Sequence, residues 1–142
     1  MATPSQNPNI VNVTVIRGNT AYLVSSGTSV TTTWTADGAS GGATALTGLT
    51  PATATVNKIG NIVVSNTSSS AVSCTIAISN NATFGSGTAY PIASAVSIPP
   101  NASLIVVDKT TSFYVTENQS VGLTSGTGGG VLTAVASFEA IT

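Results

Sequence analysis

The sequence predicts an all-β protein: an antiparallel β-sandwich, jelly-roll or Ig-like, with an extended N-terminal arm. Short runs rich in β-branched residues alternate with polar residues at a period of two, which is typical of half-buried strands. Turn signals separate these runs about every 8 to 12 residues, as in sandwiches and barrels. Leucine is scarce, and glutamate and lysine are nearly absent, so alanine is the main good helix former that remains.

The chain is expected to form an arm and one domain. Residues 1–9 are polar and contain two prolines, which predicts the extended arm, and residues 10–142 form a single sandwich. The period-two pattern predicts strands, in order, at 11–16, 20–25, 29–35, 56–66, 71–79, 103–108, 111–116, 120–123 and 132–139. Glycine, proline and amide clusters predict the connections at 18–19, 37–48, 66–70, 80–87, 99–101 and 126–130.

Three of these segments carry more specific predictions. Residues 59–79 are predicted to form a β-hairpin, because two strongly β-prone runs flank a short polar turn. Residues 89–98 are predicted to be irregular or an edge strand, since Pro91 cannot donate to a ladder. Residues 103–108 contain a near-continuous apolar run that favours a fully buried strand. The core is predicted to include six aliphatic residues: Ile62, Val64, Val72, Ile76, Ile105 and Val107.

Charge is the most unusual feature of the composition. Only 5% of the 142 residues are charged and the net charge is −1, against about 25% charged residues in ordinary soluble domains. No basic patch exists to bind nucleic acid or an anionic membrane, and no apolar run is long enough to span a bilayer. The first eight residues carry no signal pattern, which predicts synthesis in a cytoplasm.

Serine and threonine supply the missing polarity, with 19 and 24 copies. Burying a neutral hydroxyl costs far less than burying a charge, so such surfaces suit contact with neighbouring subunits. The candidate subunit contacts are Phe84 and Tyr90, which stand in glycine- and proline-flanked segments, together with Asn7 and Asn9 of the arm.

The side chains needed for most catalysis are missing, so the chain is predicted not to be an enzyme and to need no cofactor. Without histidine there is no Ser-His-Asp or Cys-His catalysis and little scope for a transition-metal site. The single cysteine, Cys74, alternates with aliphatic residues and is predicted to be a buried hydrophobe. Asp108 and Glu117 are expected to be solvated turn residues. A carboxylate pair between them, or a calcium site that adds Asp37, is the alternative.

Five segments of the second part of the chain resemble, in order, a family of small virion structural proteins of tailed bacteriophages. The segments are Asn61–Ala71, Val72–Ile78, Ile98–Val107, Val115–Leu123 and Ala134–Thr142. Glu117-Asn118 departs from the acidic-glycine pair that is common in the family. The resemblance covers about residues 56–142 and implies a β-sandwich in a phage particle, with no catalytic residues to transfer.

The leading functional hypothesis is therefore a capsid decoration, or cement, protein. It would bind the major capsid protein or other virion proteins as a homotrimer, and it would be located in the virion after synthesis in the host cytoplasm. A tail, neck or fibre position in the particle is the alternative. A carbohydrate-binding sandwich is a third hypothesis, which would require exposed coplanar aromatics and a calcium site.

Overall fold

The fold was obtained as a computed structural model, which describes residues 15–37 and 43–142. The predicted arm, with Asn7 and Asn9, and most of the first predicted strand lie outside the described residues. Within them the chain forms ten strands: β1 (Ile16–Val24), β2 (Thr33–Asp37), β3 (Ala43–Thr47), β4 (Val56–Asn66), β5 (Val72–Ser79), β6 (Ala89–Ile98), β7 (Ser103–Val107), β8 (Phe113–Val115), β9 (Ser120–Ser125) and β10 (Leu132–Ile141). A single turn of 3-10 helix, η2 (Phe84–Ser86), lies between β5 and β6.

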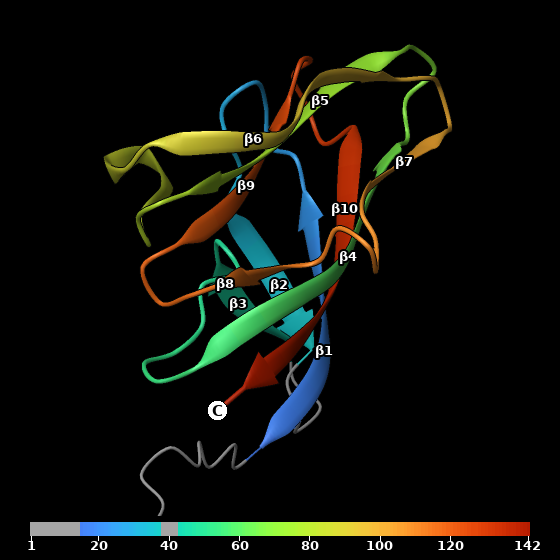
Figure 1. The fold of residues 1–142 in the computed structure, drawn as a ribbon. Helices are drawn as coiled ribbons and strands as arrows, with labels where there is room; N and C mark the ends of the chain where they lie inside the picture. The colour runs from blue at the N-terminus through green and yellow to red at the C-terminus, as the bar shows by residue number, and fades with distance from the viewer. Residues whose placement is uncertain (1–14, 38–42) are drawn as a thin grey trace, which may run out of the picture.

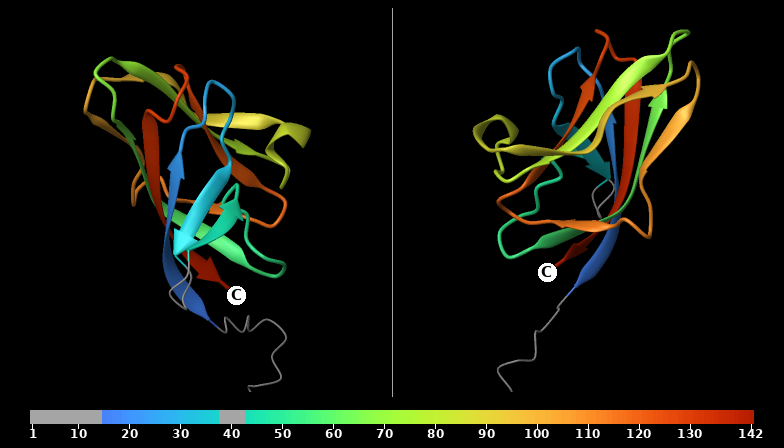
Figure 2. Two further views of the ribbon diagram at one scale, coloured as in Figure 1. Left: turned by 180° about the vertical axis from the view of Figure 1, so that it is seen from behind. Right: turned by 45° about the horizontal axis from the view of Figure 1, so that its top comes forward.

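The predicted sandwich is confirmed, because the strands form two antiparallel sheets packed face to face (Figure 1). The larger sheet has seven strands in the order β3-β2-β1-β10-β4-β7, with β8 also paired to β4. The smaller sheet has the order β6-β5-β9. Its strands cross one face of the larger sheet, and no layer formed by the described residues covers the opposite face (Figures 1 and 2).

Strict alternation gives β10 one buried face and one outward face. In β10 the buried residues are Leu132, Ala134, Ala136 and Phe138, and the residues between them point to the other face. The pairing of β4 with β10 shifts by one residue at Gly60, which forms a β-bulge. The bulge keeps Ile59 and Ile62 both fully buried, although they are three residues apart.

One cluster of buried residues fills the space between the sheets. Five of the six predicted core residues belong to it: Ile62, Val64, Val72, Ile76 and Val107. Ile105 was predicted wrongly, since its side chain is 65% exposed. It lies on β7, which pairs with β4 at the border of the larger sheet, and it points to the uncovered face.

The predicted hairpin over 59–79 is also wrong. β4 pairs with β10 on one side and with β7 and β8 on the other, while β5 pairs with β6 and β9 in the smaller sheet. Both edges of each strand are therefore occupied by other strands. The turn between them carries the chain from one sheet to the other instead of folding it back.

Two connections were also predicted differently from what is observed. Gly18 and Asn19 do not form a turn but continue β1, where Gly18 pairs with Glu139. The segment predicted as a loop over 37–48 contains β3, which pairs with β2. The prediction for residues 89–98 is confirmed in its edge-strand form, because β6 borders the smaller sheet and its register shifts twice beside Pro91 and Ala93.

Candidate interaction surface

The uncovered face of the seven-stranded sheet, called here the outer face, is the most distinctive surface of the molecule. The alternation of β1 and β10 sends every second side chain to it, while Ala21 and Leu23 on β1 and the alternate residues of β10 from Leu132 to Phe138 are buried. The pairing registers therefore determine which outward side chains are neighbours across β1, β10, β4 and β7. Directly opposite side chains on neighbouring strands lie about 5 Å apart and make contact.

One row of this face is apolar from one side to the other. Tyr22 pairs with Val135, Val135 with Val63, and Val63 with Ile105. We call these four residues the apolar row. Tyr22 is 43% exposed, Val135 40% and Ile105 65%. Val24 extends the apolar surface along β1, so the patch crosses four strands without a charged side chain.

A second row, four residue pairs further along the strands, carries the charges of the face. Gly18 pairs with Glu139, Glu139 with Lys58, and Lys58 with Tyr114 of β8. We call these four residues the charged row. Tyr114 projects at one end of it with 55% of its side chain exposed, and the other end, Gly18, has no side chain at all.

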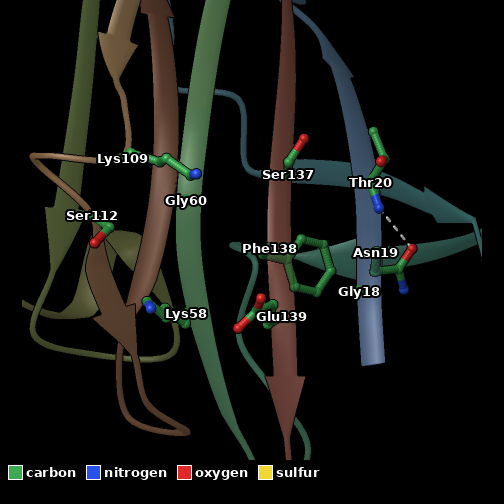
Figure 3. A pocket seen from close by; sticks show the side chains of 10 residues that line it. All are labelled: Gly18, Asn19, Thr20, Lys58, Gly60, Lys109, Ser112, Ser137, Phe138 and Glu139. Atoms are coloured by element: carbon green, nitrogen blue, oxygen red, sulfur yellow. Dashed lines mark hydrogen bonds between the residues drawn. The ribbon is translucent and has the colours of Figure 1, made fainter. Parts of the chain in front are cut away.

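A groove of about 450 Å³ lies over the charged row (Figure 3). Figure 3 shows that β1, β10 and β4 supply most of its residues and that Lys109 and Ser112 come from the segment between β7 and β8. The groove exists because Gly18, Gly60 and Ser137 are small. Lys58, Lys109 and Glu139, three of the seven charged residues of the chain, also line it.

Asp108 fixes the segment that brings Lys109 to this groove. Its Oδ1 accepts hydrogen bonds from the Thr110 Oγ1 at 2.6 Å and the Thr110 backbone N–H at 2.8 Å. These bonds, with further ones from Thr111, lower the pKa of Asp108 below its ordinary value of 3.8. The carboxylate thus closes an Asx-type turn. Asp108 is exposed in this turn, as predicted.

Glu117, the predicted alternative partner of Asp108, makes its hydrogen bond elsewhere. The Glu117 Oε2 accepts a hydrogen bond from the Ala54 backbone N–H at 3.3 Å, in a different turn. No group of three or more histidine, cysteine, aspartate or glutamate side chains comes together in the part of the chain that the structure describes. The Asp37 side chain lies outside the described residues, so the calcium alternative gains no support from it.

The two predicted contact residues of the domain lie away from the outer face. Phe84 is half-buried in η2 and packs over β9, where a Cβ added to Gly122 would lie 3.1 Å from its ring. The buried part of the Phe84 ring therefore contributes to packing within the domain. Tyr90 lies on the edge strand β6 and is 55% exposed, which leaves it accessible to another subunit.

Sequence reasoning missed the apolar row because each of its members stands in a run where both faces are apolar. Val63 and Ile105 lie between other aliphatic residues, so the pattern indicates burial on both sides. The available signal was Tyr22 and Val24 on β1, which alternate with the core residues Ala21 and Leu23 and must therefore face the other way.

Together the fold and this surface define a class: a two-layer antiparallel β-sandwich with one open sheet face that carries an apolar row and a charged row. No protein-family model, curated protein or solved structure matches this chain. No helix in the described ranges has the length and apolar character that a membrane span requires. The functional conclusion therefore rests on the chain's own residues.

Proposed function

We propose that this chain is a non-enzymatic structural protein of a tailed-bacteriophage particle and that it acts as a capsid decoration protein. The observation that carries the proposal is the apolar row, a contiguous exposed patch on a sheet face of a chain with only seven charged residues. Large exposed apolar patches on small proteins mark contact surfaces. The resemblance of residues 56–142 to small virion proteins supports the choice of particle.

The surface chemistry supports a protein that functions by burial against neighbours. Each 40 Å² of apolar area removed from water contributes about 1 kcal/mol. Around the apolar row the outer face carries mainly hydroxyls and amides, such as Thr133, Ser65 and Asn61, which can exchange water for hydrogen bonds across an interface. Few charges have to be desolvated, so most of the apolar gain is retained.

Copy number in purified particles tests this proposal. Quantitative mass spectrometry of the phage that encodes the chain would compare its amount with that of the major capsid protein. Hundreds of copies per particle are expected of a decoration protein. A few dozen copies or fewer would favour a tail, neck or fibre position instead, and absence from particles would overturn the virion assignment.

Particle stability supplies a second and independent measurement. Particles that lack the protein should lose their DNA at a lower temperature than complete ones, because the lost contacts clamp neighbouring capsid subunits. Adding back the purified protein should restore the original temperature. Equal robustness with and without it would contradict a cementing role.

A further inference from the structure

We propose that a second copy of this chain binds the outer face, related to the first by a twofold axis that runs parallel to the strands between β10 and β4. The pairing uses the face to which the proposed function assigns assembly contacts, but it does not depend on membership of a phage particle. Sheets that pack face to face keep their strands within about 30° of each other. An axis parallel to the strands satisfies this geometry.

The axis exchanges strands in pairs. It places β10 of one copy opposite β4 of the other, and β1 opposite β7 along one part of the face and opposite β8 along the other part. This follows because β7 and β8 occupy successive parts of the same edge of β4. Each row of the outer face then lies opposite the same row of the second copy with the order of its residues reversed. The face must therefore be complementary to itself.

The apolar row meets this requirement. Reversed, it places Val135 opposite Val63 of the second copy, and Tyr22 opposite Ile105 of the second copy. All four side chains thus meet apolar partners, and the twofold axis makes each of these contacts occur twice in the dimer. The most exposed member, Ile105, is covered by the largest, Tyr22.

The charged row is complementary to itself under the same axis. Glu139 and Lys58 are direct neighbours on β10 and β4, so reversal places Lys58 opposite Glu139 of the second copy and Glu139 opposite Lys58 of the second copy. Two intermolecular pairs of opposite charge result. A twofold axis across the strands would instead place these charges opposite strand ends that carry no charged residue.

The two ends of the charged row are also complementary in shape. Gly18 and Tyr114 are its end members, so reversal places the projecting Tyr114 of one copy over Gly18 of the other. The groove lined by Gly18, Gly60 and Ser137 lies at this point and has room for an aromatic ring. The row between the two, with Ser137 next to Asn61, brings a hydroxyl opposite a carboxamide.

The area of the overlap sets the strength of the pair. Four strands about 4.8 Å apart and four rows about 6.8 Å apart cover on the order of 500 Å² of flat sheet per copy. A standard interface buries about 800 Å² per partner. The pair is therefore expected to associate in the micromolar range and to be visible by sedimentation equilibrium over a range of protein concentrations.

Charge reversal provides the decisive experiment. Lys58→Glu alone and Glu139→Lys alone each create two like-charge contacts, so each homodimer should weaken by about tenfold or more. An equimolar mixture of the two variants should recover dimerisation, because the mixed pair has two contacts of opposite charge. No contact within a single chain can produce recovery on mixing.

Two further variants complete the design. Ile105→Asp should abolish association while its circular dichroism spectrum stays native, because this side chain is exposed in the monomer. Glu117→Lys, a reversal in the turn between β8 and β9, is the matched control and should dimerise normally. Unchanged association of Lys58→Glu, failure of the mixture to recover, or a species of three copies would each overturn the twofold pair. The proposed function is tested separately by copy number in particles.

Discussion

At the scale of single residues, the layer in which a side chain lies decides its role, and residue type does not. Ile76 and Ile105 are both isoleucines in β-strands. Ile76 lies on β5 and faces the larger sheet with no exposed surface, whereas Ile105 lies on the uncovered face. A charge at the first position would be buried without a partner, and at the second it would stay in water.

These two isoleucines form a matched pair for mutation. Ile76→Asp should abolish folding, because burying an unpaired carboxylate costs more than the whole stability of a typical domain, about 5 to 15 kcal/mol, unless the group is neutralised. Ile105→Asp should change the free energy of unfolding by less than about 1 kcal/mol. Far-ultraviolet circular dichroism with a thermal ramp separates the two. A folded Ile76→Asp protein would contradict the assignment of β5.

Cys74 gives a prediction that depends on pH. The thiol is fully buried, as predicted, and burial raises its pKa from 9.0 to about 11. In the unfolded chain the thiol loses its proton near pH 9, so the unfolded state binds fewer protons than the folded state above that pH. Stability should therefore fall between pH 9 and 11.

The Cys74→Ala variant isolates this contribution. Its free energy of unfolding should fall less steeply than that of the parent across the same pH window, because the substitution removes the thiol and changes no other side chain. Denaturant titrations at several pH values give the comparison. Parallel curves for the two proteins would show that the thiol does not contribute.

At the scale of elements, Asn66 holds together two of the connections that cross between the sheets. Its Nδ2 donates to the backbone carbonyls of Ser70, Ile98 and Pro99, at 2.7, 3.0 and 3.2 Å. Its Oδ1 accepts from the Ser68 backbone N–H at 2.9 Å and from the Ser68 Oγ at 2.8 Å. One buried carboxamide thus joins the β4–β5 turn to the β6–β7 turn.

Replacing this side chain should cost more than replacing an asparagine on the outer face. Asn66→Ala leaves buried carbonyls without a donor, at a cost of about 1 to 3 kcal/mol for each group that water cannot reach. We expect a loss of about 3 kcal/mol in the free energy of unfolding, and less than about 1 kcal/mol for the control Asn61→Ala. Equal losses for the two variants, measured by urea titration, would refute the bridging role.

Gly48 closes the other side of the sandwich. Its N–H donates to the Thr32 carbonyl at 2.6 Å, and its carbonyl accepts from the Val121 N–H at 2.7 Å, which links the β2–β3 hairpin to β9. Its φ is 66°, and an added Cβ would lie 2.5 Å from the Ser120 Cβ.

Gly48→Ala should therefore be destabilising, because left-handed backbone strain alone costs about 1 kcal/mol or more and the overlap with Ser120 adds to it. The measurement is the midpoint of thermal unfolding. Gly18→Ala makes a suitable control for fold stability, since nothing lies within 4 Å of a Cβ added there. A midpoint for Gly48→Ala as high as that of the control would argue against the close approach.

At the scale of the whole molecule, the two sheets share one core, and Trp34 reports on the contact between them. Trp34, on β2 of the larger sheet, is fully buried and donates from Nε1 to the Val121 carbonyl of the smaller sheet at 3.1 Å. Separation of the sheets must break this bond and expose the ring to water. The two sheets are thus expected to unfold together.

Tryptophan fluorescence tests this cooperativity, because Trp34 is the only tryptophan. Its emission and the circular dichroism signal of the strands should change at the same denaturant concentration. A fluorescence transition that precedes loss of strand signal would mean that the sheets separate before either one unfolds. In that case the shared core would not act as a single unit.

The sequence by itself determined the fold class, the approximate spans of β4, β5 and β10 and the burial of Cys74. These features depend on local chemistry: period-two alternation marks a strand with two distinct faces, and glycine, proline and asparagine mark where it ends. The edge position of β6 also follows locally, since Pro91 lacks the N–H that an interior ladder requires.

Only the tertiary structure decided which strands pair and which faces are covered. β4 and β5 are neighbours in the chain, but β4 pairs with β7, β8 and β10 while β5 pairs with β6 and β9, so they lie in different sheets. The apolar row and the exposure of Ile105 follow from this pairing. Alternation tells which side chains share a face, but the layer that covers that face is contributed by other parts of the chain.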